Sequence, residues 1–150
     1  MAIKVPPPVI TLLSVIPMVG IAGLLPATNF QFPGQVLVSV FLVAMGAGLM
    51  IVAAVQFKRH ATTINPFSPE STVKIVQHGV FSFSRNPMYL GMLLILGGIA
   101  CYLGNPLNAL VLTGFIVIIS RVQIKPEERA LLAKFGDDYQ AYLASVRRWV

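Results

Sequence analysis

Four long apolar runs divide the chain, and polar segments separate them. The runs predict four membrane-spanning helices, at about 9–25, 35–56, 88–103 and 106–120. The second run is long enough to cross a bilayer alone, because a spanning helix needs about 20 residues. The third and fourth runs are shorter, so interfacial residues at their ends should complete them.

The connections between the runs differ in length. Residues 26–34 form an uncharged turn, whereas Gly104-Asn105-Pro106 is so short that the third and fourth runs should form an antiparallel hairpin. Residues 57–87 form a connection of a length that is usually functional or disordered. Apolar residues within it argue against disorder, and a serine followed by a proline predicts a short helix over about 68–76.

The tail, residues 121–150, predicts two short amphipathic helices. Pro126 suits the first turn of one helix, and Gly136 would end it. Asp137 is expected to cap the second helix, as the first residue of a capping box. The apolar face of this second helix comprises Tyr139, Tyr142, Leu143 and Val146.

Composition decides between a membrane protein and a soluble helical protein. Of the 150 residues, 56% are hydrophobic and 11% are charged, whereas soluble domains carry about a quarter charged residues. We therefore expect an all-α integral membrane protein with one domain over residues 1–150. The bilayer is its first expected partner.

The distribution of basic residues predicts the orientation. All 11 Lys and Arg residues lie at Lys4, in the 57–87 connection or after residue 120, and the two short turns contain none. Since positive charge collects on the cytoplasmic side, both termini and the long connection should be cytoplasmic. The basic residues flank apolar runs instead of gathering on a solvated face with aromatics, so a nucleic-acid partner is not expected.

The residue content of the chain argues against a disulfide-bonded protein, a zinc protein and a proton-coupled exporter. Cys101 is the only cysteine and the chain has two histidines, so we expect neither an intrachain disulfide nor a zinc site. No predicted span contains a carboxylate, which argues against a proton-coupled exporter. A small four-span scaffold remains an alternative to an enzyme.

Two polar groups on the expected cytoplasmic side could carry chemistry, namely residues 85–89 and the pair Glu127 and Glu128. The hairpin should bring Arg85, Asn86 and Tyr89, at the start of the third run, close to Glu127, beyond the end of the fourth. A basic and an acidic group facing each other at the membrane edge suit a zwitterionic ligand. Arg85 and one of the two glutamates could instead form a structural ion pair that joins the ends of the hairpin, and Tyr89 could be an ordinary interfacial tyrosine.

Residues 78–91, HGVFSFSRNPMYLG, resemble the hallmark of the isoprenylcysteine carboxyl methyltransferase family, whose superfamily includes the phospholipid N-methyltransferases. A second motif follows at the distance usual for the family, as EERAL from Glu127 and FGDDY from Phe135. Residues 62–66, TTINP, are similar to a segment that many bacterial members carry. The resemblance covers about 62–149, more than half of the chain.

The resemblance implies a bacterial-type integral-membrane methyltransferase, in the inner membrane, that uses S-adenosylmethionine. It implies a lipophilic acceptor with a carboxylate, thiol or amine head group, and it assigns no catalytic base. At Gln123 the prenylcysteine enzymes carry an arginine that engages the substrate carboxylate, so Gln123 is the candidate substrate contact. The candidate cofactor-binding residues are Ile75, Val76, Phe81, Arg85, Asn86, Pro87, Met88, Tyr89 and Glu127.

One further alternative is a reductase. Sterol reductases have a similar C-terminal half, in which the equivalent pocket holds NADPH. They have many more spans than this chain has room for, and the Glu-Glu and Phe-Gly-Asp-Asp-Tyr pattern resembles the methyltransferase version. Binding of S-adenosylmethionine or of NADPH separates the two alternatives.

Overall fold

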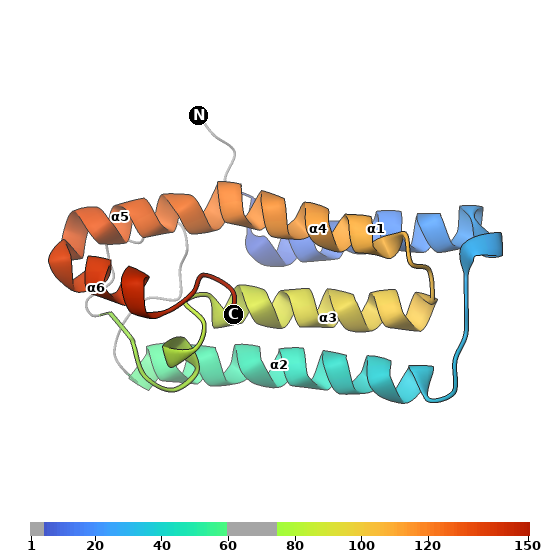
Figure 1. Ribbon diagram of the computed structural model, residues 1–150, viewed down its shortest axis with the longest axis horizontal. Helices are drawn as coiled ribbons and strands as arrows, with labels where there is room; N and C mark the ends of the chain where they lie inside the picture. Colours follow the sequence, from blue (N-terminus) through green and yellow to red (C-terminus); the bar gives the residue numbers. More distant parts are fainter. Residues whose placement is uncertain (1–4, 60–74) are drawn as a thin grey trace.

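Four long helices lie side by side in the computed structural model, which describes residues 5–59 and 75–150 (Figure 1). The described residues contain helices, turns and irregular segments but no strand, which confirms the all-α class. The four helices are α1 (Pro7–Leu24), α2 (Gln35–Arg59), α3 (Pro87–Leu103) and α4 (Asn108–Ile119). Two shorter helices, α5 (Lys125–Phe135) and α6 (Asp137–Ser145), follow at one end of the bundle.

Each predicted run corresponds to a helix, with shifted ends. Helix α1 begins at Pro7, because proline tolerates the first turn, and α3 likewise begins at Pro87. Gly104 ends α3 with φ of 64°, and its N–H donates to the carbonyls of the last turn. By length and apolarity, α1, α2 and the helix over Asn108–Phe135 could each cross a membrane, while α3 is a shorter apolar helix of 17 residues.

The helical backbone does not stop where the fourth apolar run ends, near residue 120. The helix continues from α4 through η4 (Ser120–Ile124), a π-helical turn, into α5. Pro126 has no N–H for the carbonyl four residues earlier, and its ring crowds that carbonyl. The wider π turn accommodates this, because the Lys125 N–H donates to the Ser120 carbonyl five residues back. Pro126 therefore lies within one long helix.

Two other local predictions have mixed outcomes. The short helix expected over 68–76 lies mostly outside the described residues, and 75–77 are not helical. A 3-10 helix, η3 (Gly79–Ser82), follows them. Gly136 ends α5 as predicted, but the expected Asp137 cap is wrong: Gly136 also occupies the cap position of α6, without a side-chain cap hydrogen bond.

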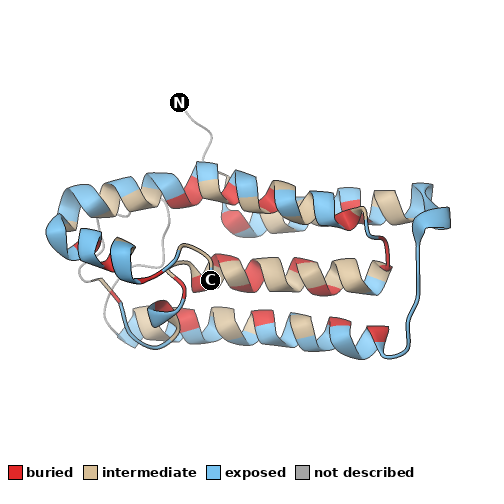
Figure 2. Cartoon of the chain, viewed as in Figure 1, coloured by how far each residue is buried: buried red, intermediate tan, exposed pale blue. Residues whose placement is uncertain are grey.

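Helix α3 is the centre of the bundle and contacts α1, α2 and α4. Figure 2 shows buried and half-buried residues along α3, whereas α2 and α4 carry many exposed positions. The α2–α3 contact depends on glycine, since a Cβ on Gly46 would lie 2.5 Å from the Gly91 carbonyl oxygen. A Cβ on Gly48, by contrast, would meet open space.

The outer surface of the bundle is apolar. Leu12 on α1, Leu37 on α2 and Leu110 on α4 are 70%, 74% and 69% exposed. An apolar surface of this extent is unusual for a soluble monomer but suits contact with lipid.

A polar cluster closes the end of the bundle opposite α5 and α6. Asn105 is buried there, and its Nδ2 donates to Thr28 Oγ1 and to Asn29 Oδ1, both at 2.7 Å. Gln35 Nε2 donates to the Cys101 carbonyl at 2.8 Å. These bonds tie the turn after α1 and the start of α2 to the α3–α4 hairpin, so the lengthwise register of the helices is fixed at this end.

Candidate functional site

Tyr89 and Glu127 meet at the end of the bundle that carries α5 and α6. Tyr89 lies in the first turn of α3 and Glu127 in the first turn of α5. The Tyr89 phenol O–H donates to Glu127 Oε1 at 2.6 Å, a distance typical of a strong hydrogen bond to a carboxylate. The antiparallel hairpin brings the two residues to one level, as the sequence predicts.

The neighbouring carboxylate, Glu128, binds two arginines. Arg85 approaches Glu128 Oε1 at 3.3 Å, and Arg148 donates to both carboxylate oxygens, at 3.0 and 2.7 Å. The structural ion pair between Arg85 and a glutamate is therefore present. Its partner is Glu128 and not Glu127, since consecutive residues of a helix point about 100° apart. Arg85 Nε is buried and has no hydrogen-bond acceptor among the described residues.

An apolar wall stands beside these charged groups. Val76, Phe81 and Met88 pack in one cluster with Ala53 and Phe57 of α2. The Phe57 and Phe81 ring centroids are 4.7 Å apart. This wall joins the loop before α3 to the last turns of α2.

Two further candidate cofactor-binding residues, Ile75 and Pro87, also lie at this end of the bundle. Ile75 packs against the cluster of α5 and α6 that includes Tyr139 and Tyr142. Pro87 is fully buried at the start of α3. The residues that the motif predicts therefore gather at one end of the bundle, although they divide between three apolar clusters.

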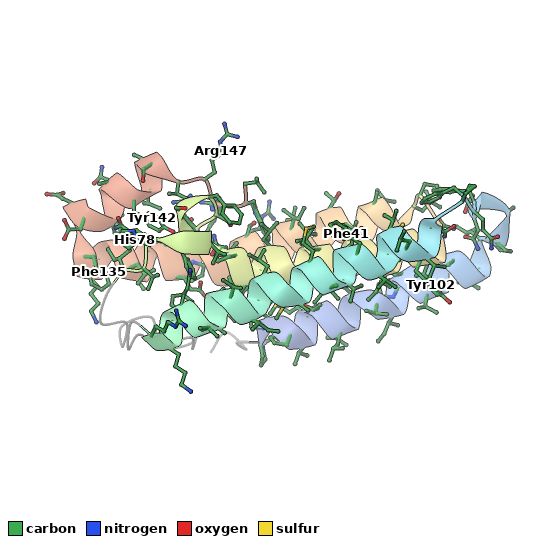
Figure 3. The ribbon with its side chains drawn as sticks, turned by 90° about the horizontal axis from the view of Figure 1, so that it is seen from below. Phe41, His78, Tyr102, Phe135, Tyr142 and Arg147 are labelled. Carbon is green, nitrogen blue, oxygen red and sulfur yellow. The ribbon has the colours of Figure 1, made fainter. Side chains whose placement is uncertain are left out.

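Helix α6 holds the loop before α3 in place. The Tyr142 phenol O–H donates to the Phe81 carbonyl at 2.7 Å, and burial raises the pKa of this phenol to about 12. Burial also raises the pKa of Tyr139, which packs beside it. Figure 3 shows Tyr142 and His78 at the same end of the molecule, far from Tyr102 at the other end.

Asn86 and Gln123 have partners that the motif does not predict. Asn86 Nδ2 donates to the Arg148 carbonyl at 2.9 Å. Gln123 is buried in η4, and its Nε2 donates to the Val5 carbonyl at 2.8 Å, in the segment before α1. The Gln123 amide therefore donates to the segment before α1 and not to the Tyr89–Glu127 pair.

Comparison with known proteins shows the family. A sequence model of the family described as phospholipid methyltransferase matches residues 35–138. The chain belongs to the phospholipid methyltransferase family. The match runs from the start of α2 into α6 and includes both Tyr89 and Glu127.

Individual relatives agree with this family. An "uncharacterized protein" of Haemophilus influenzae is 48% identical over 63 residues, which are 42% of this chain and all of that protein. A "probable protein-S-isoprenylcysteine O-methyltransferase" occurs in each of two rice subspecies, Oryza sativa indica and japonica. Each is 29% identical over 109 residues, which are 73% of this chain and 57% of the rice protein. No solved structure matches the chain.

Membership in the phospholipid methyltransferase family confirms the superfamily that the two motifs predict. Together with the apolar helices, it supports an integral membrane methyltransferase. The chain spans little more than half the length of the rice relatives.

Glu128 was expected at this end of the bundle beside Glu127, but the contacts of Arg148 and Trp149 with this end were not predicted. Their signal was present as the segment Arg147-Arg148-Trp149, two cations and the only tryptophan directly after an amphipathic helix. The basic residues of the tail were used only to predict orientation, whereas Arg148 binds the Glu128 carboxylate.

Proposed function

We propose that this protein transfers a methyl group from S-adenosylmethionine to a lipophilic acceptor at the cytoplasmic edge of the membrane. The observation that carries the proposal is the Tyr89–Glu127 hydrogen bond, because it joins the two family motifs into one site. Family membership supports a methyltransferase, and the identities of the cofactor and of the acceptor class are part of this proposal.

The side chains at this end fit the polar groups of S-adenosylmethionine. The buried N–H of Arg85 Nε has no acceptor in the part of the chain that the structure describes, so it can donate to the carboxylate of the cofactor. Glu127 accepts the Tyr89 phenol through Oε1, and its Oε2 can accept from an amino or hydroxyl group. The apolar wall of Val76, Phe81 and Met88 suits the adenine. The remaining proposed cofactor contacts are Ile75, Asn86 and Pro87.

S-adenosylmethionine, when bound, supplies a methyl group activated by a positively charged sulfur. The residues of this chain would orient the reactants and exclude water, since a direct displacement needs the nucleophile about 3–3.5 Å from the carbon and in line. A carboxylate or thiolate acceptor needs no general base. An amine acceptor must first lose a proton, and we assign no residue to that role.

The proposed topology has four spans with both termini cytoplasmic, in a bacterial inner membrane. The 17-residue α3 completes the set of spans because it runs between the longer apolar helices. Labelling of intact cells tests this arrangement. With Cys101 replaced by serine, a membrane-impermeant maleimide should label a cysteine at Gln31, in the turn after α1, and not one at Arg147. Labelling at Arg147 would contradict the topology.

The function itself is tested by ligand binding and methyl transfer. Purified protein in lipid nanodiscs should bind radiolabelled S-adenosylmethionine saturably and should not bind NADPH. With methyl-labelled cofactor it should transfer the label to an organic-extractable product from a lipid extract, or to a prenylcysteine analogue. Binding of NADPH alone would favour the reductase, and binding of neither would favour a scaffold.

A further inference from the structure

The segment after α6 crosses the candidate site. Residues 147–149, the strap, bind three elements in succession. The Arg85 N–H donates to the Arg147 carbonyl at 3.1 Å, Arg148 binds Glu128 of α5, and Trp149 Nε1 donates to Ser120 Oγ of η4 at 3.3 Å. In Figure 1 the chain returns from α6 and ends in front of the first turn of α3.

The anchors of the strap surround the Tyr89–Glu127 pair. Asn86, three residues before Tyr89, donates to the Arg148 carbonyl, and Glu128, next to Glu127, accepts the Arg148 guanidinium. The Trp149 side chain packs against the core cluster that contains Tyr89. The strap therefore connects the start of α3 to the start of α5, directly beside the hydrogen bond between Tyr89 and Glu127.

We propose that the strap is a lid over the cofactor site, and that the Arg148–Glu128 ion pair is its latch. The proposal rests on the proposed function, since it requires that S-adenosylmethionine binds between α3 and α5. Opening the lid would admit and release the cofactor. It would also free the Asn86 amide N–H groups, which the closed strap engages, for contact with the cofactor.

The charges at the latch favour reversible opening. The Arg148 side chain is 36% exposed, so water can solvate its guanidinium when it leaves. The Glu128 side chain is only 13% exposed, and a buried carboxylate without a partner would be unfavourable. Arg85, itself 10% exposed and 3.3 Å away, remains paired with Glu128 after Arg148 departs. The second arginine thus stabilises the open state.

Arg147 provides a matched control. Its side chain is exposed and projects away from the body of the molecule in Figure 3. It contributes to the strap through its backbone carbonyl, which an alanine variant keeps. Arg147→Ala and Arg148→Ala therefore remove the same side chain from adjacent positions, one outside the latch and one inside it.

The test measures the rates of S-adenosylmethionine binding and release with full-length protein in nanodiscs. Trp149, the only tryptophan, gives a fluorescence signal within the strap, and retained radiolabel gives an independent signal. Arg148→Ala should raise both the association and the dissociation rate, each by roughly fivefold, because a partly exposed ion pair contributes modestly. Arg147→Ala should leave both rates unchanged.

The test separates failure of the proposed function from failure of the lid proposal. If wild-type protein does not retain radiolabel, the proposed function fails and the lid proposal fails with it. If it binds but both variants keep wild-type rates, only the lid proposal is overturned. Slower association in Arg148→Ala would show a damaged site and would also overturn it. Should Arg148→Ala fold poorly, Arg148→Lys keeps the charge and should show the same faster rates to a smaller extent.

Discussion

The phenol of Tyr89 donates a 2.6 Å hydrogen bond to the carboxylate of Glu127, across 38 positions of the sequence. Two features of the fold produce this contact. The hairpin turn at Gly104 returns the chain along α3, and the helix over 108–135 then passes the start of α3 without a break. A break at residue 120 would leave the position of Glu127 to a flexible loop.

Close packing of α2 on α3 predicts different effects for two nearby glycines. Gly46→Ala should lower the free energy of unfolding by about 1–3 kcal/mol, because the new Cβ would lie 2.5 Å from the Gly91 carbonyl oxygen. Gly48→Ala faces open space and should leave stability unchanged or slightly raised. Thermal unfolding in detergent compares them, and equal losses would contradict this packing.

The Asn105 cluster predicts a stability effect separate from the site. Asn105→Ala removes the donor to Thr28 and Asn29 and the acceptor of the Leu107 N–H. We expect a loss of about 1–3 kcal/mol, since buried polar groups lose their partners. The affinity for S-adenosylmethionine should not change in protein that remains folded. Weaker binding would mean that the two ends of the bundle are coupled.

Burial of Tyr142 predicts a stability change at high pH. Its pKa is about 12 in the folded protein and about 10 in the unfolded chain, so the folded state holds its proton more tightly. The resulting stability is complete below pH 10 and is lost as the pH rises from about 10 to about 12.

Tyr142→Phe isolates this effect. The variant should be less stable than wild type at pH 8, because the Phe81 carbonyl loses its donor. Its unfolding temperature should also fall less steeply between pH 9.5 and 11.5. Parallel curves for the two proteins would show that Tyr142 does not contribute to the pH dependence.

The apolar runs and the hairpin could be predicted because both depend on local sequence. Run length and apolarity predict helices, and Gly104-Asn105-Pro106 leaves no room for anything but a return. The same reasoning brought Tyr89 and Glu127 together. It also placed Tyr139, Tyr142 and Val146 on one buried face, which the structure confirms.

The partners of individual polar groups could not be predicted in this way. The π turn over Ser120–Ile124 adds a residue to one helical turn, so the helical phase assigned to α4 does not carry over to α5. The sequence therefore predicts that Arg85 can pair with a glutamate, but it does not decide between Glu127 and Glu128. The hydrogen bond from Gln123 to the Val5 carbonyl was not predicted either. The position of the strap depends on contacts between distant segments that no local pattern records.

The assignment of Tyr89 and Glu127 to a cofactor site can be tested by equilibrium binding of S-adenosylmethionine to three matched variants. Tyr89→Phe removes the donor of the 2.6 Å hydrogen bond, and Glu127→Gln replaces its charged acceptor by a neutral amide. Each should weaken binding roughly tenfold or more, because hydrogen bonds to charged groups are the stronger ones. Tyr102→Phe removes an exposed phenol at the opposite end and should bind like wild type. We expect saturable binding by the wild type that only Tyr89→Phe and Glu127→Gln weaken. Wild-type affinity in all three variants, or equal loss in all three, would contradict it.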